Sequence, residues 1–232
     1  MSAPLSGFRV IELAGVLAGP SAGQLFAELG ADVIKVEPPG GDVTRTWRLP
    51  SEASGETTDR NDRPAYFSAA NWGKRSVALD LGQPGGREAL HLLVRGADVV
   101  LTAYRPGSAE RLGADAATLR ALSPRLVVAE LTGYGPDNPR AGYDAVIQAE
   151  SGFMHLNGPT EGAAPEASGE SGPTKMPVAL MDLLAAHQIK EGVLAALLRR
   201  ERTGEGATVQ VSLTAAAAGA LANQGTAWLQ AG

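Results

Sequence analysis

Residues 8–37 constrain the fold more than any other stretch, because they read in succession as strand, turn, helix and strand. Phe8 to Leu13 is a continuous apolar run typical of a buried strand, and Ser21 to Leu29 has the spacing of an amphipathic helix. Asp32 to Glu37 then reads as a second strand. Strands that follow each other through a helix pair in parallel, so this unit predicts a parallel sheet.

The same alternation returns along the chain. Further strands are expected at 76–81, 97–104, 126–131 and 209–213, with helices at 84–95, 116–122 and 145–154. We therefore predict an α/β protein with a Rossmann-like parallel sheet and helices on both faces. Ligands bind beyond the carboxyl ends of the strands in such sheets. The loops at those ends, GVLAGPSAG, TAYRPGS and TGYGPDNPRAGYD, carry glycines, tyrosines and arginines.

Composition excludes several classes of protein. The 232 residues are 44% hydrophobic, enough for a substantial core, and the net charge of −5 argues against nucleic acid or an anionic membrane as a partner. The absence of cysteine excludes disulfides and thiolate chemistry. We see no signal peptide and no apolar run of about 18 residues, so we expect a cytoplasmic protein. His155 and His187 lie far from acidic residues at ligand spacing, so we expect no metal.

Three glycines follow the first strand at a period of four: Gly15, Gly19 and Gly23. This spacing is not G-x-G-x-x-G, and no Gly-Lys-Ser/Thr follows, so a dinucleotide site or a P-loop is weakly supported. A tight strand-to-helix turn is the favoured interpretation. Two long polar stretches, 38–63 and 158–174, are expected to be loops.

Asp182 is the one acid in an apolar run from Pro177 to Ala186, between an extended entry at 176–181 and a helix. An Asp there is either an N-cap or a partly desolvated carboxylate with a shifted pKa. The residues alone favour the cap, because Asp before an apolar helix is common. Gly192 inside the helix indicates close approach by a neighbouring element.

Five motifs in order resemble the family III CoA-transferases, over residues 5–213. They are LSGFRVIELAGVLAGPSAGQLFAELGADVIKVEPPGGDVTR, NWGKRSVALDL, AYRPGSAERLG, GYDAVIQAESGFM and PVALMDLLAAHQIKEGVLAALLRRERTGEGATVQVSL. The resemblance implies that Asp182 is the nucleophile and reverses the preference for a cap. It also implies a set of residues that line a CoA channel: Val16, Ala18, Asn71, Trp72, Lys74, Arg75, Tyr104, Arg105, Arg111, Tyr143 and Asp144.

The chemistry of coenzyme A agrees with this set. Cations suit its phosphates, and an aromatic ring such as that of Tyr104 can pack on adenine. Pro38 stands where the formyl-CoA member of the family has a cation, with Arg45 as a substitute. The implied reaction moves CoA from an acyl-CoA donor to a carboxylic acid through an aspartyl mixed anhydride and an aspartyl-CoA thioester. Backbone N–H groups around GESG, residues 169–172, or around GPT are candidates for stabilising the oxyanion.

Two other functions remain open. A 2-methylacyl-CoA racemase of the same fold family would use a histidine where this chain has Tyr143. The other is a truncated CoA-binding or assembly subunit, because family members are longer, with a small second domain and a C-terminal return that are absent here. We expect residues 1–213 to form the large domain and 214–232 a helix leading to a missing domain. We also expect a homodimer or a complex with a partner chain.

Overall fold

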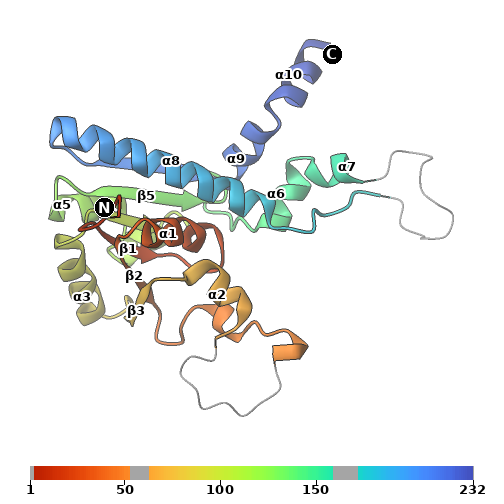
Figure 1. Cartoon of the computed structure of the whole chain (residues 1–232). Helices are drawn as coiled ribbons and strands as arrows, with labels where there is room; N and C mark the ends of the chain where they lie inside the picture. Colours follow the sequence, from red (N-terminus) through yellow and green to blue (C-terminus); the bar gives the residue numbers. More distant parts are fainter. Residues whose placement is uncertain (1–2, 53–62, 159–171, 232) are drawn as a thin grey trace.

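The computed structural model describes residues 3–52, 63–158 and 172–231 and contains one six-stranded sheet, in which every neighbouring pair is parallel. The order across the sheet is β3-β2-β1-β4-β5-β6. The predicted α/β architecture is confirmed (Figure 1). The strands are β1 (Arg9–Leu13), β2 (Asp32–Glu37), β3 (Arg75–Ala78), β4 (Val99–Thr102), β5 (Val127–Thr132) and β6 (Ala207–Ser212).

Helices connect and cover these strands. They are α1 (Ala18–Glu28), α2 (Ala65–Asn71), α3 (Pro84–Arg95), α4 (Ser108–Arg111), α5 (Ala116–Leu122), α6 (Asp144–Glu150), α7 (Phe153–Asn157), α8 (Leu180–Thr203), α9 (Leu213–Ala220) and α10 (Ala222–Ala231), with short 3-10 helices η1 (Val43–Thr46) and η2 (Pro50–Glu52). Among the described helices none is long and apolar enough to cross a membrane.

Two hydrophobic clusters fill the two faces of the sheet. Alternate strand residues point to opposite faces, so Val10 packs in the cluster with α1, α8 and α9, while Ile11 packs in the cluster with α3 and α5. Strands covered on both sides need continuous apolar sequence, which is why β1, β4 and β5 are almost wholly buried. Helix α10 instead projects away from the sheet (Figure 1).

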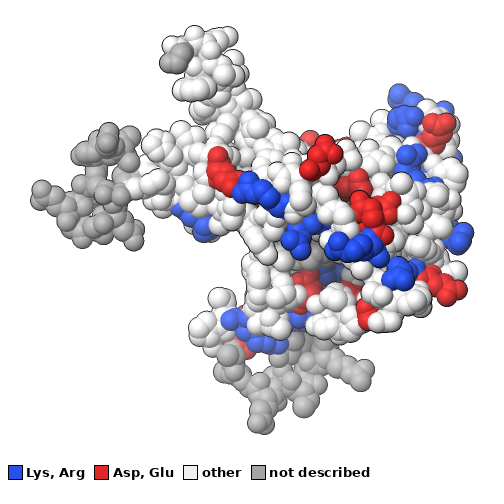
Figure 2. All heavy atoms as spheres, turned by 180° about the vertical axis from the view of Figure 1, so that it is seen from behind, with Lys and Arg blue, Asp and Glu red and all other residues white. Residues whose placement is uncertain are grey.

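The direction of the chain across the sheet reverses at β1. This strand pairs with β2 on one side and β4 on the other, so that Val10 lies beside Val33 and Val99. The connections after β1 and β4 leave the sheet in opposite directions and open a crevice at their carboxyl ends. Figure 2 shows basic and acidic side chains interspersed over one face of the described molecule.

Several predicted boundaries differ from the structure. Helix α1 begins at Ala18, inside the expected turn, and the helix predicted for 145–154 is two helices separated by Gly152 at φ +86°. Helix α2 lies just after the predicted loop 38–63 and was not predicted, because its apolar residues have no clear helical period. Helix α8 begins at Leu180, so Met181 is helical and not extended. Part of the predicted loops, residues 53–62 and 159–171, lies outside the described residues.

The close approach predicted at Gly192 is confirmed. A Cβ atom added there would lie 2.6 Å from Cγ1 of Val209 on β6, closer than carbon atoms tolerate. Glycine therefore lets α8 pack directly on the sheet, at the cost of its lower helix propensity.

Gly192→Ala should lower the free energy of unfolding by about 1–3 kcal/mol, because overpacking against Val209 outweighs the gain in helix propensity. Adding Val209→Ala should recover much of the loss. The measurement is urea denaturation of the two variants. Gly85→Ala on α3 is a control, because a Cβ there meets nothing within 4 Å. Equal effects at both glycines would contradict the packing argument.

Candidate active site

A pocket of about 380 Å³ lies at the carboxyl ends of β1, β4 and β5, in the crevice where the chain direction reverses. Loops that follow three different strands supply most of its wall, and Asp182 comes from the first turn of α8. Its lining consists of Gly15, Val16, Leu17, Ala18, Ala103, Tyr104, Arg105, Leu131, Thr132, Gly133, Ala141, Gly142, Tyr143, Asp144, Asp182 and Leu213. The structure therefore brings together Asp182 and six other residues of the predicted set: Val16, Ala18, Tyr104, Arg105, Tyr143 and Asp144.

Asp182 does not cap its own helix. It is the third residue of α8, and the N-cap position is held by Ala179, which makes no side-chain capping bond. The cap comes from Asp144 on α6, whose Oδ2 accepts hydrogen bonds from the backbone N–H groups of Met181 (2.7 Å) and Asp182 (3.2 Å). The N-cap interpretation of Asp182 is thus wrong, because another helix already satisfies the donors that a cap would satisfy.

Gln148 fixes the capping carboxylate in place. This buried side chain donates to Oδ1 of Asp144 (2.5 Å) and to the carbonyl oxygen of Val178 (3.2 Å), and it accepts the N–H of Met176 (2.9 Å). The segment that leads into α8 is therefore bonded to Gln148 of α6 at two residues, Met176 and Val178. Asp144, which the sequence suggested as a CoA contact, has a structural role in this arrangement.

The environment of Asp182 favours its protonated form. Burial raises the pKa of its carboxyl group from 3.8 to about 6, and the neighbouring Asp144 carboxylate contributes to the shift. No described residue donates a hydrogen bond to its side chain, so both carboxylate oxygens are free for a ligand in the pocket. A carboxylate that is desolvated, unpaired and largely ionised at neutral pH has the properties of a nucleophile or base.

Tyr66 is a residue near this site that the sequence did not suggest. Its phenol lies on α2, and burial together with the carboxylates of Asp182, Asp144 and Asp42 raises its pKa. Its ring also packs edge to face with that of Trp47, at a centroid distance of 5.0 Å. The sequence signal for this neighbour of the site was the pair of aromatic residues Trp47 and Tyr66. The sequence could not place them beside Asp182, because their positions depend on the fold.

A second pocket, of about 750 Å³, adjoins the first and shares Tyr104, Arg105 and Thr132 with it. It extends along the carboxyl ends of β4, β5 and β6 toward α5. Arg105 is exposed, and its side chain forms no hydrogen bond or ion pair with the described residues, so its guanidinium is available to a ligand. Burial raises the pKa of Tyr104, which keeps its phenol neutral.

Lys74 differs from its predicted role as a CoA contact, because its ammonium group is buried and all its hydrogen atoms are bonded within the protein. It donates to the carbonyl oxygens of Pro20 (2.8 Å) and Ala70 (2.7 Å) and to Oδ1 of Asn71 (2.9 Å), and it pairs with Glu12 (2.7 Å). Its side chain is 2% exposed, and burial lowers its pKa to about 8. Lys74 and Asn71 are thus internal structural residues, and a phosphate could reach neither without displacing these bonds.

The other predicted residues also lie apart from the Asp182 pocket. Arg75 pairs with Asp32 (2.6 Å), Arg111 donates to Ser108 (2.9 Å), and Trp72 is 73% exposed. Asn71, Lys74 and Arg75 line a separate recess of about 60 Å³, which shares no residue with either larger pocket. The proposed substitute for a cation at Pro38, Arg45, is held by Glu37 (2.6 Å).

The candidate oxyanion segment and a metal site were also considered from the sequence. Residues 169–171, which carry most of the candidate oxyanion segment GESG, lie outside the described residues. In the described part of the chain, no group of three His, Cys, Asp or Glu side chains could hold a metal ion.

Asp182→Asn should stabilise the fold at neutral and alkaline pH, because Asn has the same shape and carries no buried charge. A carboxyl pKa raised from 3.8 to about 6 on folding costs up to about 3 kcal/mol of stability above pH 6, and this cost disappears below pH 3.8. Denaturation curves from pH 4 to 8 should therefore diverge as the pH rises. Asp137→Asn, in an exposed loop, is the control. A variant less stable than the wild type at pH 8 would contradict this account.

Comparison with known proteins agrees with the geometry. The family model described as CoA-transferase family III matches residues 5–232. The chain is 42% identical to a succinate–glutarate CoA-transferase of Agrobacterium fabrum, over 99% of this chain and 56% of the relative. It is 38% identical to an acetyl-CoA:oxalate CoA-transferase of Acetobacter aceti, over 90% and 51% respectively.

Solved structures give the same result. A CaiB/BaiF family protein from Brucella suis is similar with a TM-score of 0.85 and 39% identity, covering 99% of this chain and 58% of that one. Rv3272 from Mycobacterium tuberculosis is similar with a TM-score of 0.81 and 38% identity, covering 98% and 58%. The chain thus spans about half the length of the curated relatives it matches.

Proposed function

Because the chain belongs to CoA-transferase family III, we propose that it transfers CoA from an acyl-CoA donor to a carboxylic acid, with Asp182 as the nucleophile. The observation that supports this most is the state of Asp182. Its carboxylate is unpaired, has a pKa of about 6 and lines a pocket at the carboxyl end of the sheet. At neutral pH it is mostly ionised and only weakly solvated, which favours attack on a carbonyl carbon.

The proposed reaction proceeds by covalent exchange at this carboxylate. An oxygen of Asp182 attacks the thioester carbonyl, CoA thiolate leaves, and a mixed anhydride forms. The thiolate then attacks the aspartyl carbonyl, releasing the donor acid and leaving an aspartyl-CoA thioester. The acceptor carboxylate attacks that thioester to give a second anhydride, and the thiolate finally attacks the acceptor's acyl carbon, so that Asp182 is regenerated. Each step exchanges one leaving group, and water must be kept from the anhydrides.

The geometry favours one orientation of the donor. The acyl end occupies the pocket with Asp182, and the anionic part of CoA lies near Arg105, where the two pockets meet. Tyr104 offers an aromatic surface at the same junction. Lys74 and Arg75 have no part in this orientation. The two relatives compared above are named for dicarboxylates, so succinate, glutarate and oxalate are the acceptors to test first.

The alternatives differ in the chemistry they require. A racemase needs a histidine base, and the described lining of the Asp182 pocket contains Tyr143 and no histidine. A CoA-binding subunit would bind CoA without forming an adduct.

We further propose that the active form is a homodimer or a complex with a partner chain, because Trp228 and Leu229 on the projecting helix α10 are 71% and 76% exposed.

Asp182→Asn should abolish CoA exchange while leaving acyl-CoA binding within about twofold, because only the attacking charge is removed. Incubation of the wild type with succinyl-CoA, followed by hydroxylamine or borohydride, should modify residue 182 specifically, as mass spectrometry of peptides would show. Deuterium incorporated at the α-carbon without an adduct would instead support the racemase. An adduct on another residue would remove Asp182 from the mechanism.

Arg105→Ala should weaken acyl-CoA binding by at least about tenfold and reduce its salt dependence, because one charge-assisted contact to phosphate is lost. Arg75→Ala is the matched control and should bind normally, since Arg75 lies outside both pockets and pairs with Asp32. Calorimetry at two salt concentrations measures both effects. The opposite pattern, with Arg75 essential and Arg105 neutral, would place the phosphates at the small recess.

A further inference from the structure

We propose that Lys35 and Asp42 are positioning residues, which hold the β1–α1 loop (residues 14–17) in the conformation that forms one wall of the Asp182 pocket. This inference rests on the proposed function, because it assigns the loop to the acyl-CoA site. Neither side chain lines that pocket, so neither is a catalytic residue.

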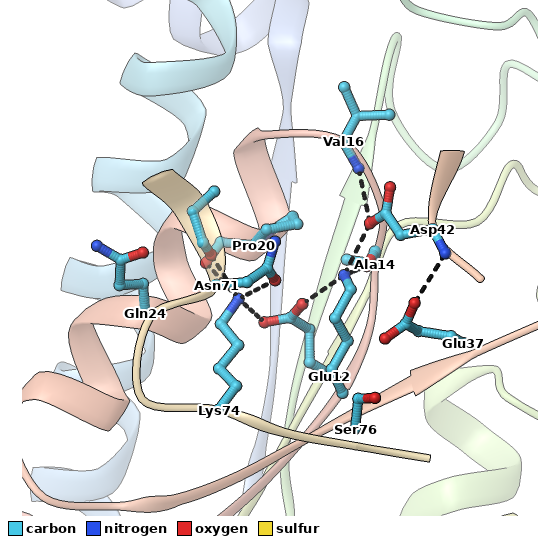
Figure 3. Close-up of polar contacts among 12 residues, drawn as sticks. Glu12, Ala14, Val16, Pro20, Gln24, Glu37, Asp42, Asn71, Lys74 and Ser76 are labelled. Carbon is cyan, nitrogen blue, oxygen red and sulfur yellow. Dashed lines mark hydrogen bonds and ion pairs between the residues drawn. The ribbon is translucent and has the colours of Figure 1, made fainter. Parts of the chain in front are cut away.

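The two side chains hold the loop at two points, Ala14 and Val16, on either side of Gly15. Figure 3 shows Val16 bonded to Asp42. The Lys35 ammonium donates to the carbonyl oxygen of Ala14 (2.6 Å), and Oδ2 of Asp42 accepts the N–H of Val16 (3.3 Å). Lys35 and Asp42 also pair directly at 2.9 Å. We call these three contacts the clamp.

Val16 explains why the loop needs a clamp. Its φ is +67°, and it is the only non-glycine residue with positive φ among the described residues. A β-branched residue rarely adopts this strained left-handed backbone conformation. The conformation persists only where the surrounding structure holds it. Val16 lines the Asp182 pocket with Leu17 and Ala18, so relaxation of its backbone would move that wall.

Asp42 is itself held rigidly. Its Oδ1 accepts the backbone N–H and the hydroxyl of Thr44, at 2.9 and 2.8 Å, and its own N–H donates to Glu37 (2.8 Å). The side chains of Lys35 and Asp42 are each only 1% exposed, so water cannot take over their contacts. A rigid, dry acceptor is suited to holding one backbone N–H in a strained position.

Glu12 connects the clamp to Lys74. Its two oxygens pair with Lys35 at 2.9 Å and with Lys74 at 2.7 Å. Since Asp42 also pairs with Lys35, the charges of two acids and two lysines balance each other in the interior. A Cβ at Gly23 would lie 1.9 Å from Oε2 of Glu12, so α1 can approach this pair only with glycine at that position. Removing Lys35 and Asp42 together therefore leaves the neutral pair Glu12–Lys74.

The test uses a double variant that removes the clamp without leaving a lone buried charge. Lys35→Met with Asp42→Ala removes all three contacts and leaves the balanced pair Glu12–Lys74. Two quantities are measured on folded protein: affinity for succinyl-CoA, and the intraresidue amide-to-α-proton NOE of Val16, which is strong only at positive φ. We expect the NOE to weaken and the affinity to fall by about tenfold in the double variant.

Val16→Gly separates positioning from general stability. Glycine adopts positive φ without strain, so adding it to the double variant should restore most of the affinity without restoring thermal stability. Asp80→Ala, which removes an aspartate bond to a backbone N–H in a distant turn, should change neither quantity.

Three outcomes would overturn the proposal: an unchanged Val16 NOE in the folded double variant, unchanged affinity in the double variant, or no recovery with Val16→Gly. Failure of the proposed function has a different signature. A wild-type chain that binds no succinyl-CoA contradicts the CoA site, whereas the NOE of Val16 still tests whether the clamp sets the loop.

Discussion

Four buried charges are the constraint on which the rest of this structure depends: Glu12 on β1, Lys35 on β2, Asp42 after β2 and Lys74 just before β3. Glu12 and Lys35 lie on strands covered by helices on both faces, so each would be strongly destabilising alone. Removing one member of such a buried pair typically costs about 3–5 kcal/mol. Burial lowers the pKa of Lys35, but Glu12 and Asp42 outweigh burial and raise it, whereas Lys74 pairs with Glu12 alone and its pKa falls to about 8.

The close packing of α1 follows from the same cluster. Gly19 and Gly23 give α1 a narrow face against the end of β1, where a Cβ at Gly19 would lie 2.3 Å from that of Ala14, whereas Gly15 precedes the helix. Side chains at these positions would push α1 away and open the charges to water. The glycine pattern therefore has a packing function in this fold, and no phosphate-binding role is needed to explain it.

Asp182 and Asp144 are two aspartates at the start of α8 whose positions give them different environments. The N-terminus of α8 favours negative charge, and Asp144 takes the capping bonds there from a neighbouring helix. Asp182 is left without donors in a partly buried place, and burial outweighs the helix dipole, so its pKa rises. The capping carboxylate is thereby fixed by hydrogen bonds, and the uncapped one faces the pocket without a donor among the described residues.

The sequence by itself determined the parallel α/β sheet, most of its strands and the tight approach at Gly192, because periodicity and glycine spacing are local signals. It also singled out Asp182 as an unusual acid in an apolar run, although the residues alone favoured a helix cap there. Only the tertiary structure decided that Asp144 caps α8, that Lys74 is internal and that Tyr66 lies near Asp182. The bonds of Asp144 to Asp182 and of Lys74 to Pro20 join residues 38 and 54 positions apart. Such contacts depend on how α2 packs on α1 and how α6 packs on α8. A cation in a sequence carries no sign of whether its partner is a ligand or the protein's own interior.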